Sequence, residues 1–228
     1  MGCGCVGPSK DKYSIENILG EKIQEPKEIN SKYPITDYVR KVYCLINKVR
    51  LNPGEFVNVI ETAEKYIKEI NGRKIFDDNK IKVSLNEGKK MFQDCADYLR
   101  NLQPMEELNF CDDIVLECPK DEHNIKDINF FKERLLEKKE KYGIEAYFKD
   151  SIRVPEISVL LMLVDDSAKN PRRKRETLLN PKYKYIGISS SDKDENKNNI
   201  NLNEDNNNIE TIIRYELNKP FCAYFTLK

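Results

Sequence analysis

The chain has 228 residues, in which 39 Lys and Arg balance 39 Asp and Glu. A net charge of zero excludes recognition of nucleic acid or of an anionic membrane through the overall charge, so such a partner would have to bind a local cluster. The length suits one large domain with appended segments, and we expect a single core. No apolar run approaches the roughly 18 residues that span a bilayer, and the first residues lack the apolar stretch of a secretory signal. We therefore expect a cytosolic protein.

The sequence contains seven cysteines, an odd number scattered over the whole chain. Because no export signal precedes them, we expect reduced thiols rather than a disulfide framework. Cys111, Cys118 and His123 are near one another in sequence, but His123 is the only histidine and the spacing fits no zinc pattern. We expect inert or buried thiols, no bound metal and no cofactor.

The first six residues, Met-Gly-Cys-Gly-Cys-Val, form a candidate acylation motif. Removal of the methionine would expose Gly2 for N-myristoylation, and Cys3 and Cys5 lie beside it as candidate palmitoylation sites. One myristoyl chain binds a membrane weakly and reversibly, so stable anchoring needs a second acyl chain, which a neighbouring cysteine would carry. Val6 departs from the motif, which prefers Ser or Thr there. The alternative is an unmodified tail with two chance cysteines.

Residues 1–35 are interpreted as this acylated tail followed by a linker, because prolines alternate there with charged and polar residues. From residue 36 the spacing of apolar residues predicts a folded domain that continues to residue 228. Two amphipathic helices are predicted first, at 36–52 and 54–71, and we expect them to pack antiparallel.

The middle of the domain is predicted to be mainly helical after a loose hairpin or loop at 73–83. Ser84 and Glu87 form a potential capping box for a third helix, which ends before Pro104. Further helical segments are predicted at 112–118, 130–142 and 155–164.

The last third of the chain changes to the two-residue periodicity of strands. Antiparallel strands are predicted at 185–188, 209–217 and 221–227, and the asparagine-rich stretch 192–208 is interpreted as a mobile insertion. Helices followed by a small sheet predict an α+β protein whose helices cover the sheet. The side chains expected in its core are Val42, Ile46, Phe92, Leu99, Leu161 and Ile186.

The segment from Leu45 to Pro53 reads Leu-Ile-Asn-Lys-Val-Arg-Leu-Asn-Pro. It resembles the opening helix of the CAP superfamily (cysteine-rich secretory, antigen 5 and pathogenesis-related proteins), in the form common in bacteria and protists. Four further blocks resemble the family in the same order: Glu87-Gly88 with Leu99–Phe110, Lys141–Gly143, Leu160–Asp166 with Leu179–Ile188, and Cys222–Phe225. The resemblance covers about residues 36–228. It implies a CAP-like α-β-α sandwich with a small antiparallel sheet.

CAP domains usually join two histidines and two acidic residues in a cleft that can hold a divalent metal. The resemblance implies that this site is degenerate here, because Arg173 or Lys174 falls at one histidine position and neither binds a metal as imidazole does. Asp150 could keep one acidic position. The loop of the second histidine is shortened, and His123 does not match it. We expect Asp150 to pair with one of the basic residues rather than to bind metal.

The strongest local charge in the sequence is a basic run made of Lys169, Arg172, Arg173, Lys174 and Arg175. Either it is a solvated loop, or it contacts anionic lipid heads or an acidic protein surface. Nucleic acid is not expected as a partner, because no aromatic residues interleave with the basic ones. Elsewhere the sequence has no nucleophile elbow and no phosphate loop, so we expect no enzyme.

These observations predict a non-catalytic, lipid-anchored CAP-like protein that acts through protein partners as a structural or interaction component of a larger assembly. The cytosolic leaflet of a membrane is its expected location. The Asn- and Lys-rich composition, common in protists, points more weakly to a cilium or axoneme. The main alternative is a lipid-binding protein, since some CAP proteins bind sterols or fatty acids. A metal-dependent hydrolase is a third and weaker alternative.

Overall fold

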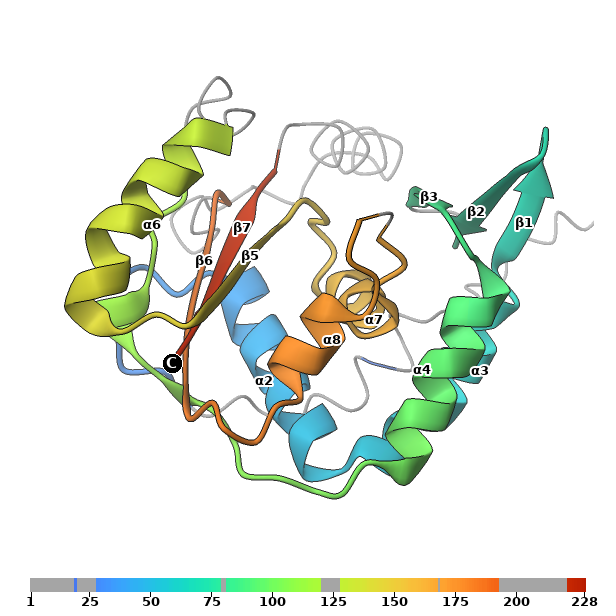
Figure 1. Cartoon of the computed structure of the whole chain (residues 1–228), viewed down its shortest axis with the longest axis horizontal. Coiled ribbons are helices and arrows are strands. Elements are labelled where there is room, and N and C mark those ends of the chain that lie inside the picture. The colour runs from blue at the N-terminus through green and yellow to red at the C-terminus, as the bar shows by residue number, and fades with distance from the viewer. Residues whose placement is uncertain (1–18, 20–27, 79–80, 120–127, 168, 193–220) are drawn as a thin grey trace, which may run out of the picture.

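The computed structural model describes residue 19 and residues 28–78, 81–119, 128–167, 169–192 and 221–228. They form an α+β fold in three layers, with helices on both faces of a mixed sheet (Figure 1). The helices are α2 (Asp37–Leu51), α3 (Val57–Glu64), α4 (Lys89–Asn101), α6 (Ile128–Tyr142), α7 (Pro155–Val164) and α8 (Arg173–Leu178), with 3₁₀ turns η1 (Pro53–Phe56) and η2 (Asp112–Ile114).

The central sheet contains β4 (Asn109–Phe110), β5 (Ala146–Asp150), β6 (Tyr185–Ser190) and β7 (Ala223–Leu227) in the order β4-β6-β7-β5. β7 is antiparallel to both β5 and β6, whereas β4 is parallel to β6, so the sheet is mixed rather than purely antiparallel as expected. Gly187 of β6 allows the chain after β4 to approach closely. A Cβ atom at this position would lie only 2.9 Å from the carbonyl carbon and oxygen of Ile114.

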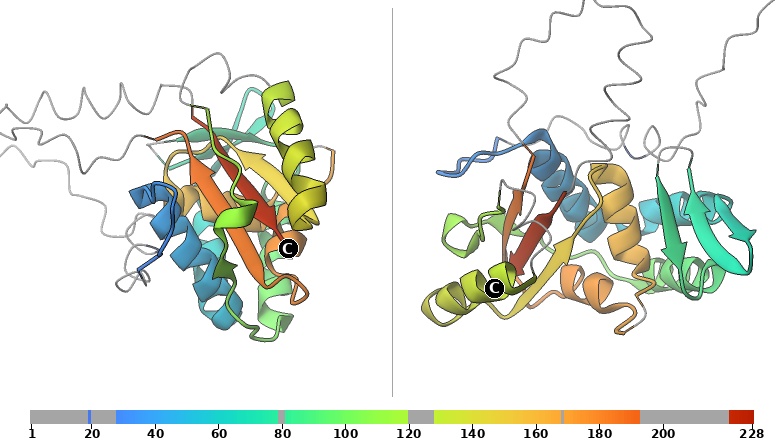
Figure 2. Two further views of the ribbon diagram at one scale, coloured as in Figure 1. Left: turned by 90° about the vertical axis from the view of Figure 1, so that its left-hand side faces the viewer. Right: turned by 90° about the horizontal axis from the view of Figure 1, so that it is seen from above.

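The alternation of residues along β7 produces two separate cores, because successive strand residues point to opposite faces of a sheet. Phe225 and Leu227 pack in the larger core with α2, α4 and α7. Tyr224 points the other way and packs with Phe131 and Leu135 of α6. Two perpendicular views agree that α6 covers one face of the sheet and that α2 and α7 lie beyond the other (Figures 1 and 2).

Most of the predicted core is confirmed: Val42, Ile46, Phe92, Leu99 and Ile186 are buried, whereas Leu161 is only partly buried. The core also contains Leu19, which is 1% exposed. Ser31 donates a hydrogen bond to Asp112 of η2, and Tyr33 lies 3.4 Å from Lys138 of α6. Contacts with the domain therefore begin before residue 36, inside the stretch that was interpreted as a linker.

The predicted helix at 54–71 is wrong in its second half. α3 ends at Glu64, and Ile67 then pairs with Phe76 in a separate antiparallel sheet of β1 (Ile67–Ile70), β2 (Arg73–Asp77) and β3 (Lys82–Leu85). Asn71 and Gly72 both have positive φ, of 52° and 72°. Positive φ at both central residues is the geometry of a type I′ hairpin turn, so Asn-Gly connects two strands here rather than ending a helix.

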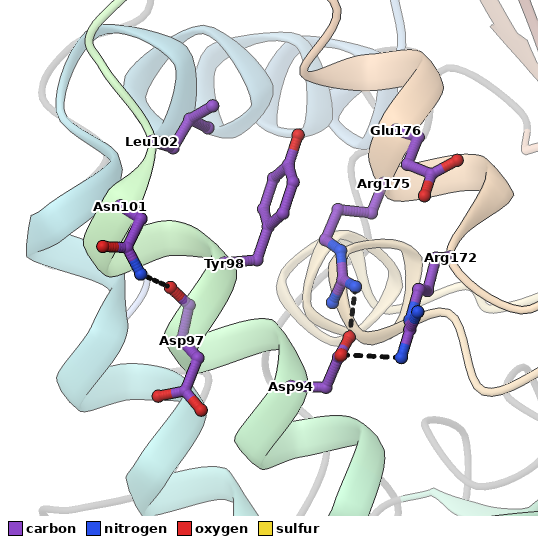
Figure 3. Close-up of a pocket in the computed structure, with 8 residues that line it drawn as sticks. All are labelled: Asp94, Asp97, Tyr98, Asn101, Leu102, Arg172, Arg175 and Glu176. Atoms are coloured by element: carbon purple, nitrogen blue, oxygen red, sulfur yellow. Dashed lines mark hydrogen bonds and ion pairs between the residues drawn. The ribbon is translucent and has the colours of Figure 1, made fainter.

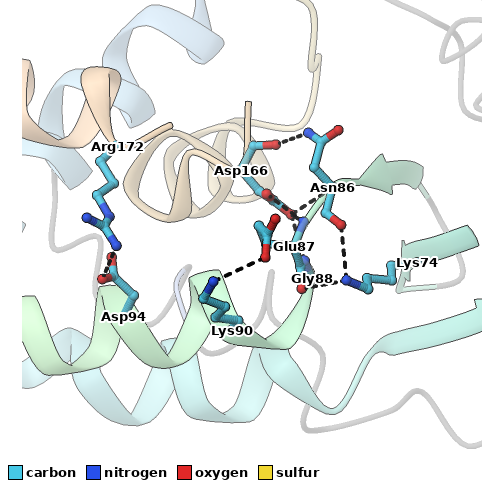
Figure 4. Close-up of polar contacts among 8 residues, drawn as sticks. All are labelled: Lys74, Asn86, Glu87, Gly88, Lys90, Asp94, Asp166 and Arg172. Carbon is cyan, nitrogen blue, oxygen red and sulfur yellow. Dashed lines mark hydrogen bonds and ion pairs between the residues drawn. The ribbon is translucent and has the colours of Figure 1, made fainter. Parts of the chain in front are cut away.

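The predicted capping box is also wrong, because Ser84 lies in β3 and α4 begins at Lys89. The chain just before α4 is held instead by Asp166, about 80 residues away, whose carboxylate accepts hydrogen bonds from the backbone N–H groups of Asn86, Glu87 and Gly88 at 2.8 to 3.1 Å (Figure 4). A carboxylate near the start of a helix is also stabilised by the helix dipole. The chain after α7 thus fixes the start of α4.

The other predicted elements have mixed outcomes. The helices at 36–52, 130–142 and 155–164 are confirmed as α2, α6 and α7, whereas the segment 112–118 contains only the single turn η2. Strands at 185–188 and 221–227 are confirmed, and β5 was not predicted. The strand at 209–217 and the insertion at 192–208, apart from Asp192, lie outside the described residues.

A buried arginine joins α2 to two distant loops. Arg50 is fully buried, and its guanidinium donates to the backbone carbonyls of Glu106 at 2.8 Å, Leu178 at 2.7 Å, and Asn180 and Tyr183 at 3.2 Å. One turn earlier, Asn47 exchanges two hydrogen bonds with the backbone of Leu108. These two polar residues of the segment Leu45–Pro53 therefore connect α2 to the chain before β4 and to the chain at the end of α8.

We predict that Arg50→Met lowers the free energy of unfolding by about 3 kcal/mol or more, because four buried carbonyls lose their donor. Arg50→Lys should recover little of this loss, since one ammonium group cannot reach all four carbonyls. The matched control is Arg100→Met, whose side chain is exposed and ion-paired and whose removal should change stability by less than about 1 kcal/mol. Urea denaturation measures all three, and equal effects of Arg50→Met and Arg100→Met would contradict the role of Arg50.

Candidate functional site

The candidate site is built around Asp150, the last residue of β5, which is 6% exposed. Its Oδ2 atom accepts hydrogen bonds from the Ser158 hydroxyl at 2.8 Å and from the backbone N–H of Ile152 at 3.2 Å. Its Oδ1 atom lies 3.3 Å from the ammonium group of Lys174. Both carboxylate oxygens are thus engaged by the protein itself.

The hydrogen bonds continue inward from Asp150 to α2. Ser158 is fully buried in α7, and its hydroxyl lies 2.8 Å from the hydroxyl of Tyr38. Burial, and secondarily the charge of Asp150, raise the pKa of Tyr38 well above its ordinary value. Tyr38 therefore stays protonated, and it cannot serve as a base near neutral pH.

Lys174 is held in place by its own backbone. Its N–H group donates to the carboxylate of Asp165 at 2.7 Å in the first turn of α8. Its side chain, which is 26% exposed, passes over the ring of Phe148 toward Asp150. A buried carboxylate is costly unless it is paired and hydrogen-bonded, and Lys174 and Ser158 meet both needs. The expectation that Asp150 pairs with a basic residue is confirmed.

The donor set of this site does not suit a metal ion. Its groups are one carboxylate, an ammonium, a serine hydroxyl and a tyrosine hydroxyl, and a cation already occupies the side of Asp150 where a metal would bind. Nowhere in the described ranges are three His, Cys, Asp or Glu side chains grouped so that they could hold an ion. His123 lies outside those ranges.

The basic run does not form one surface. Lys169, Arg172 and Arg173 are exposed, and the guanidinium of Arg173 lies over the ring of Tyr147. Arg175 is 1% exposed and bound to Asp94, so the expectation that it contacts an anionic partner is wrong. Its guanidinium also lies over the ring of Tyr98 and donates to the backbone carbonyl of Leu163, and a run of charges in the sequence does not indicate such contacts. The ammonium group of Lys174 is ion-paired with Asp150.

A second feature is an open pocket of about 440 Å³ between α4 and α8 (Figure 3). Asp94 lies at its base and bridges Arg172, at 2.7 Å, and Arg175. The ring of Tyr98 lies 4.9 Å from the guanidinium of Arg175. The remaining lining residues are Asp97, Asn101, Leu102 and Glu176. Both arginines of the pocket are thus paired with Asp94, and the lining residues include no nucleophile with a base.

The predicted lipid-attachment residues cannot be placed, and two residues near Asp150 were not predicted from the sequence. Gly2, Cys3 and Cys5 lie outside the described residues. Ser158 and Tyr38 were not recognised beforehand. The only signal for Ser158 is that the otherwise apolar run 155–164 contains a serine and a glutamate, and both are buried.

Comparisons with known proteins do not identify the chain. No family model matches it, and neither the curated proteins nor the solved structures include a significant match. The described helices are all too short or too polar to cross a membrane. The CAP resemblance and the functions that it implies therefore stay predictions, whereas the α+β class is established by the structure.

We predict that Lys174→Met lowers the free energy of unfolding by about 2 kcal/mol, because it leaves a buried carboxylate without its cation. Asp150→Asn in the same chain should recover part of the loss, so that the double variant is about 1 kcal/mol more stable than the sum of the single effects. Lys169→Met, on the connection between α7 and α8 and exposed, is the control and should change stability by less than about 0.5 kcal/mol. Additive single effects would show that the pair is not coupled.

Proposed function

We propose that this chain is a non-catalytic, CAP-like protein that is anchored to the cytosolic face of a membrane by acyl chains and acts as a structural or interaction component of an assembly. The main support for the proposal is that both carboxylate oxygens of Asp150 already have partners within the protein. Its two oxygens are bound to Lys174, Ser158 and the backbone of Ile152. Substrate or metal could reach Asp150 only by breaking these contacts.

The absence of catalysis is supported by how the other buried polar groups are used. Arg50 and Asn47 bind backbone groups of distant loops, and Asp165 and Asp166 bind backbone N–H groups at the starts of α8 and α4. Hydrolysis needs a nucleophile or activated water beside a base of suitable pKa. These four side chains stabilise the fold, and this use of them supports a role without catalysis.

The anchor is supported by the sequence of the N-terminus and by the weakness of the alternative, which is electrostatic binding. Gly2 with Cys3 and Cys5 would give the two acyl chains that stable membrane binding requires. Exposed basic residues add only about 1 kcal/mol each near an anionic membrane. Within the described ranges, Lys169 and Arg173 are the members of the basic run that have no carboxylate partner. They are too few to hold the protein at a membrane.

Protein partners are favoured over a bound sterol or fatty acid. A lipid-binding site encloses most of its ligand, whereas the pocket between α4 and α8 is open to solvent and contains the ion pairs of Asp94 with Arg172 and Arg175. A fold that is retained while its polar site is closed is most simply maintained by its surface contacts. We extend the proposal to assembly at a ciliary or other cytosolic membrane.

We predict that Gly2→Ala moves the full-length protein from the membrane to the soluble fraction of cells, because both myristoylation and the palmitoylation that follows it are lost. Cys3→Ser with Cys5→Ser should retain an alkyne-myristate label but bind membranes weakly. The matched control is Gly4→Ala, which keeps the acceptor glycine and both cysteines. Unchanged membrane association of the Gly2→Ala protein would contradict the anchor.

A further inference from the structure

Two cysteines that are 104 positions apart in sequence meet at one end of the central sheet. Cys222 directly precedes β7 and is 0% exposed, and Cys118 lies half-buried in the segment after η2. The sulfur of Cys118 lies 3.5 Å from the carbonyl oxygen of Cys222 and 3.5 Å from that of Ser189. Cys222 is two residues before Tyr224 and shares its side of the sheet, where Cys118 packs against the same cluster.

The surrounding backbone keeps the two thiols together. Ser191 donates its N–H to the Cys222 carbonyl at 2.9 Å, and the Cys222 N–H donates to the Ser191 hydroxyl at 3.0 Å. The Ser189 hydroxyl is within 3.3 Å of the Cys118 sulfur. Both cysteines are therefore attached to the same end of the β6–β7 pair, and neither depends on a freely moving loop for its position.

Each of the two cysteines shifts the pKa of the other, and the shifts have opposite directions. The hydrogen bond from Cys118 is the main cause that lowers the pKa of Cys222, with a smaller contribution from the charge of Lys149. Burial is the main cause that raises the pKa of Cys118. Cys95 is a useful contrast, because burial raises its pKa to about 11 and no second thiol lies beside it among its interacting groups. Thiolate is the reactive form of cysteine, so the pair differs from the isolated thiol.

We propose that Cys118 and Cys222 form a reversible dithiol–disulfide pair, a redox modification site that responds to a peroxide. Hydrogen peroxide oxidises one sulfur of the pair to a sulfenic acid and is reduced to one water molecule. The other sulfur then attacks the oxidised one, so that the S–S bond forms, the S–O bond breaks and the hydroxyl leaves as water with the proton of the attacking thiol. In sum the two thiols lose two electrons and two protons, and the peroxide becomes two water molecules.

The disulfide would attach the chain after η2 covalently to the start of β7. It would close a loop of about one hundred residues, and a cross-link over so long a loop restricts the unfolded chain strongly. We expect the oxidised protein to unfold at a midpoint temperature roughly 5 °C or more above that of the reduced protein. A small thiol reductant should reverse the shift.

The test uses the full-length protein, reduced and then treated with hydrogen peroxide, after which free thiols are alkylated and the chain is digested with trypsin. Cleavage after Arg100 and Lys120 releases residues 101–120, which contain Cys111 and Cys118. Cleavage after Arg214 releases residues 215–228 with Cys222, because Lys219 precedes a proline. We expect a reducible cross-link between these two peptides, together with the rise in midpoint temperature.

Single substitutions assign the cross-link to its residues. Cys118→Ser should abolish both the cross-link and the temperature shift, and since this small side chain is only partly buried the variant should still fold. Cys111→Ser is the matched control, because it lies in the same peptide and packs against the same cluster, and it should retain both. The proposal is overturned if the cross-link persists in Cys118→Ser, if it disappears in Cys111→Ser, or if peroxide oxidises the thiols of the unsubstituted protein without joining the two peptides.

Discussion

The guanidinium of Arg50 binds the backbone of two distant segments and fixes both of them against α2. It is a buried cation that is solvated almost entirely by backbone carbonyls, and these come from the loop before β4 and from the chain between α8 and β6. Burial lowers its pKa, and the carboxylate of Glu106 acts in the opposite direction, but an arginine remains charged in either case. Because the carbonyl of Leu178 ends α8, Arg50 fixes one end of this short helix. Asp165 fixes the other end by accepting the N–H of Lys174, and the Lys174 side chain is thereby placed beside Asp150.

The sequence predicted the elements whose signals are local. α2, α6 and α7 have an apolar period and a proline or glycine at a boundary, and their predicted limits were nearly correct. β1 was missed because Ile67 and Ile70 are three residues apart, which fits a helix face, and because Asn71-Gly72 can end a helix or turn a hairpin. The contact of Asp166 with the chain just before α4 could not be predicted from nearby residues, since the two segments are about 80 positions apart. The pairing of Asp150 was expected, whereas the burial of Arg175 against Asp94 depends on tertiary packing alone.

Two polar residues of the segment Leu45–Pro53 have structural roles, although polar residues in a sequence motif can suggest a functional site. Asn47 and Arg50 stand out in the sequence as polar groups on an amphipathic helix, and both are used to bind backbone carbonyls or amides. The same holds for the two adjacent aspartates after α7, each of which binds the start of a different helix. These internal roles account for the polar groups without any catalytic use of them. This is the physical basis for proposing a binding or structural role rather than catalysis.

We propose that the carboxylate at the end of β5 stabilises the fold and binds no ligand. Calorimetric titration of the reduced protein with zinc tests this proposal. We expect no saturable binding that depends on Asp150, because Lys174 holds a positive charge at 3.3 Å from its Oδ1 atom and repels a divalent ion. Tight zinc binding by the unmodified protein that is lost on Asp150→Ala, but retained in the Cys118→Ser variant, would contradict the claim and reopen the metal-dependent enzyme as an alternative.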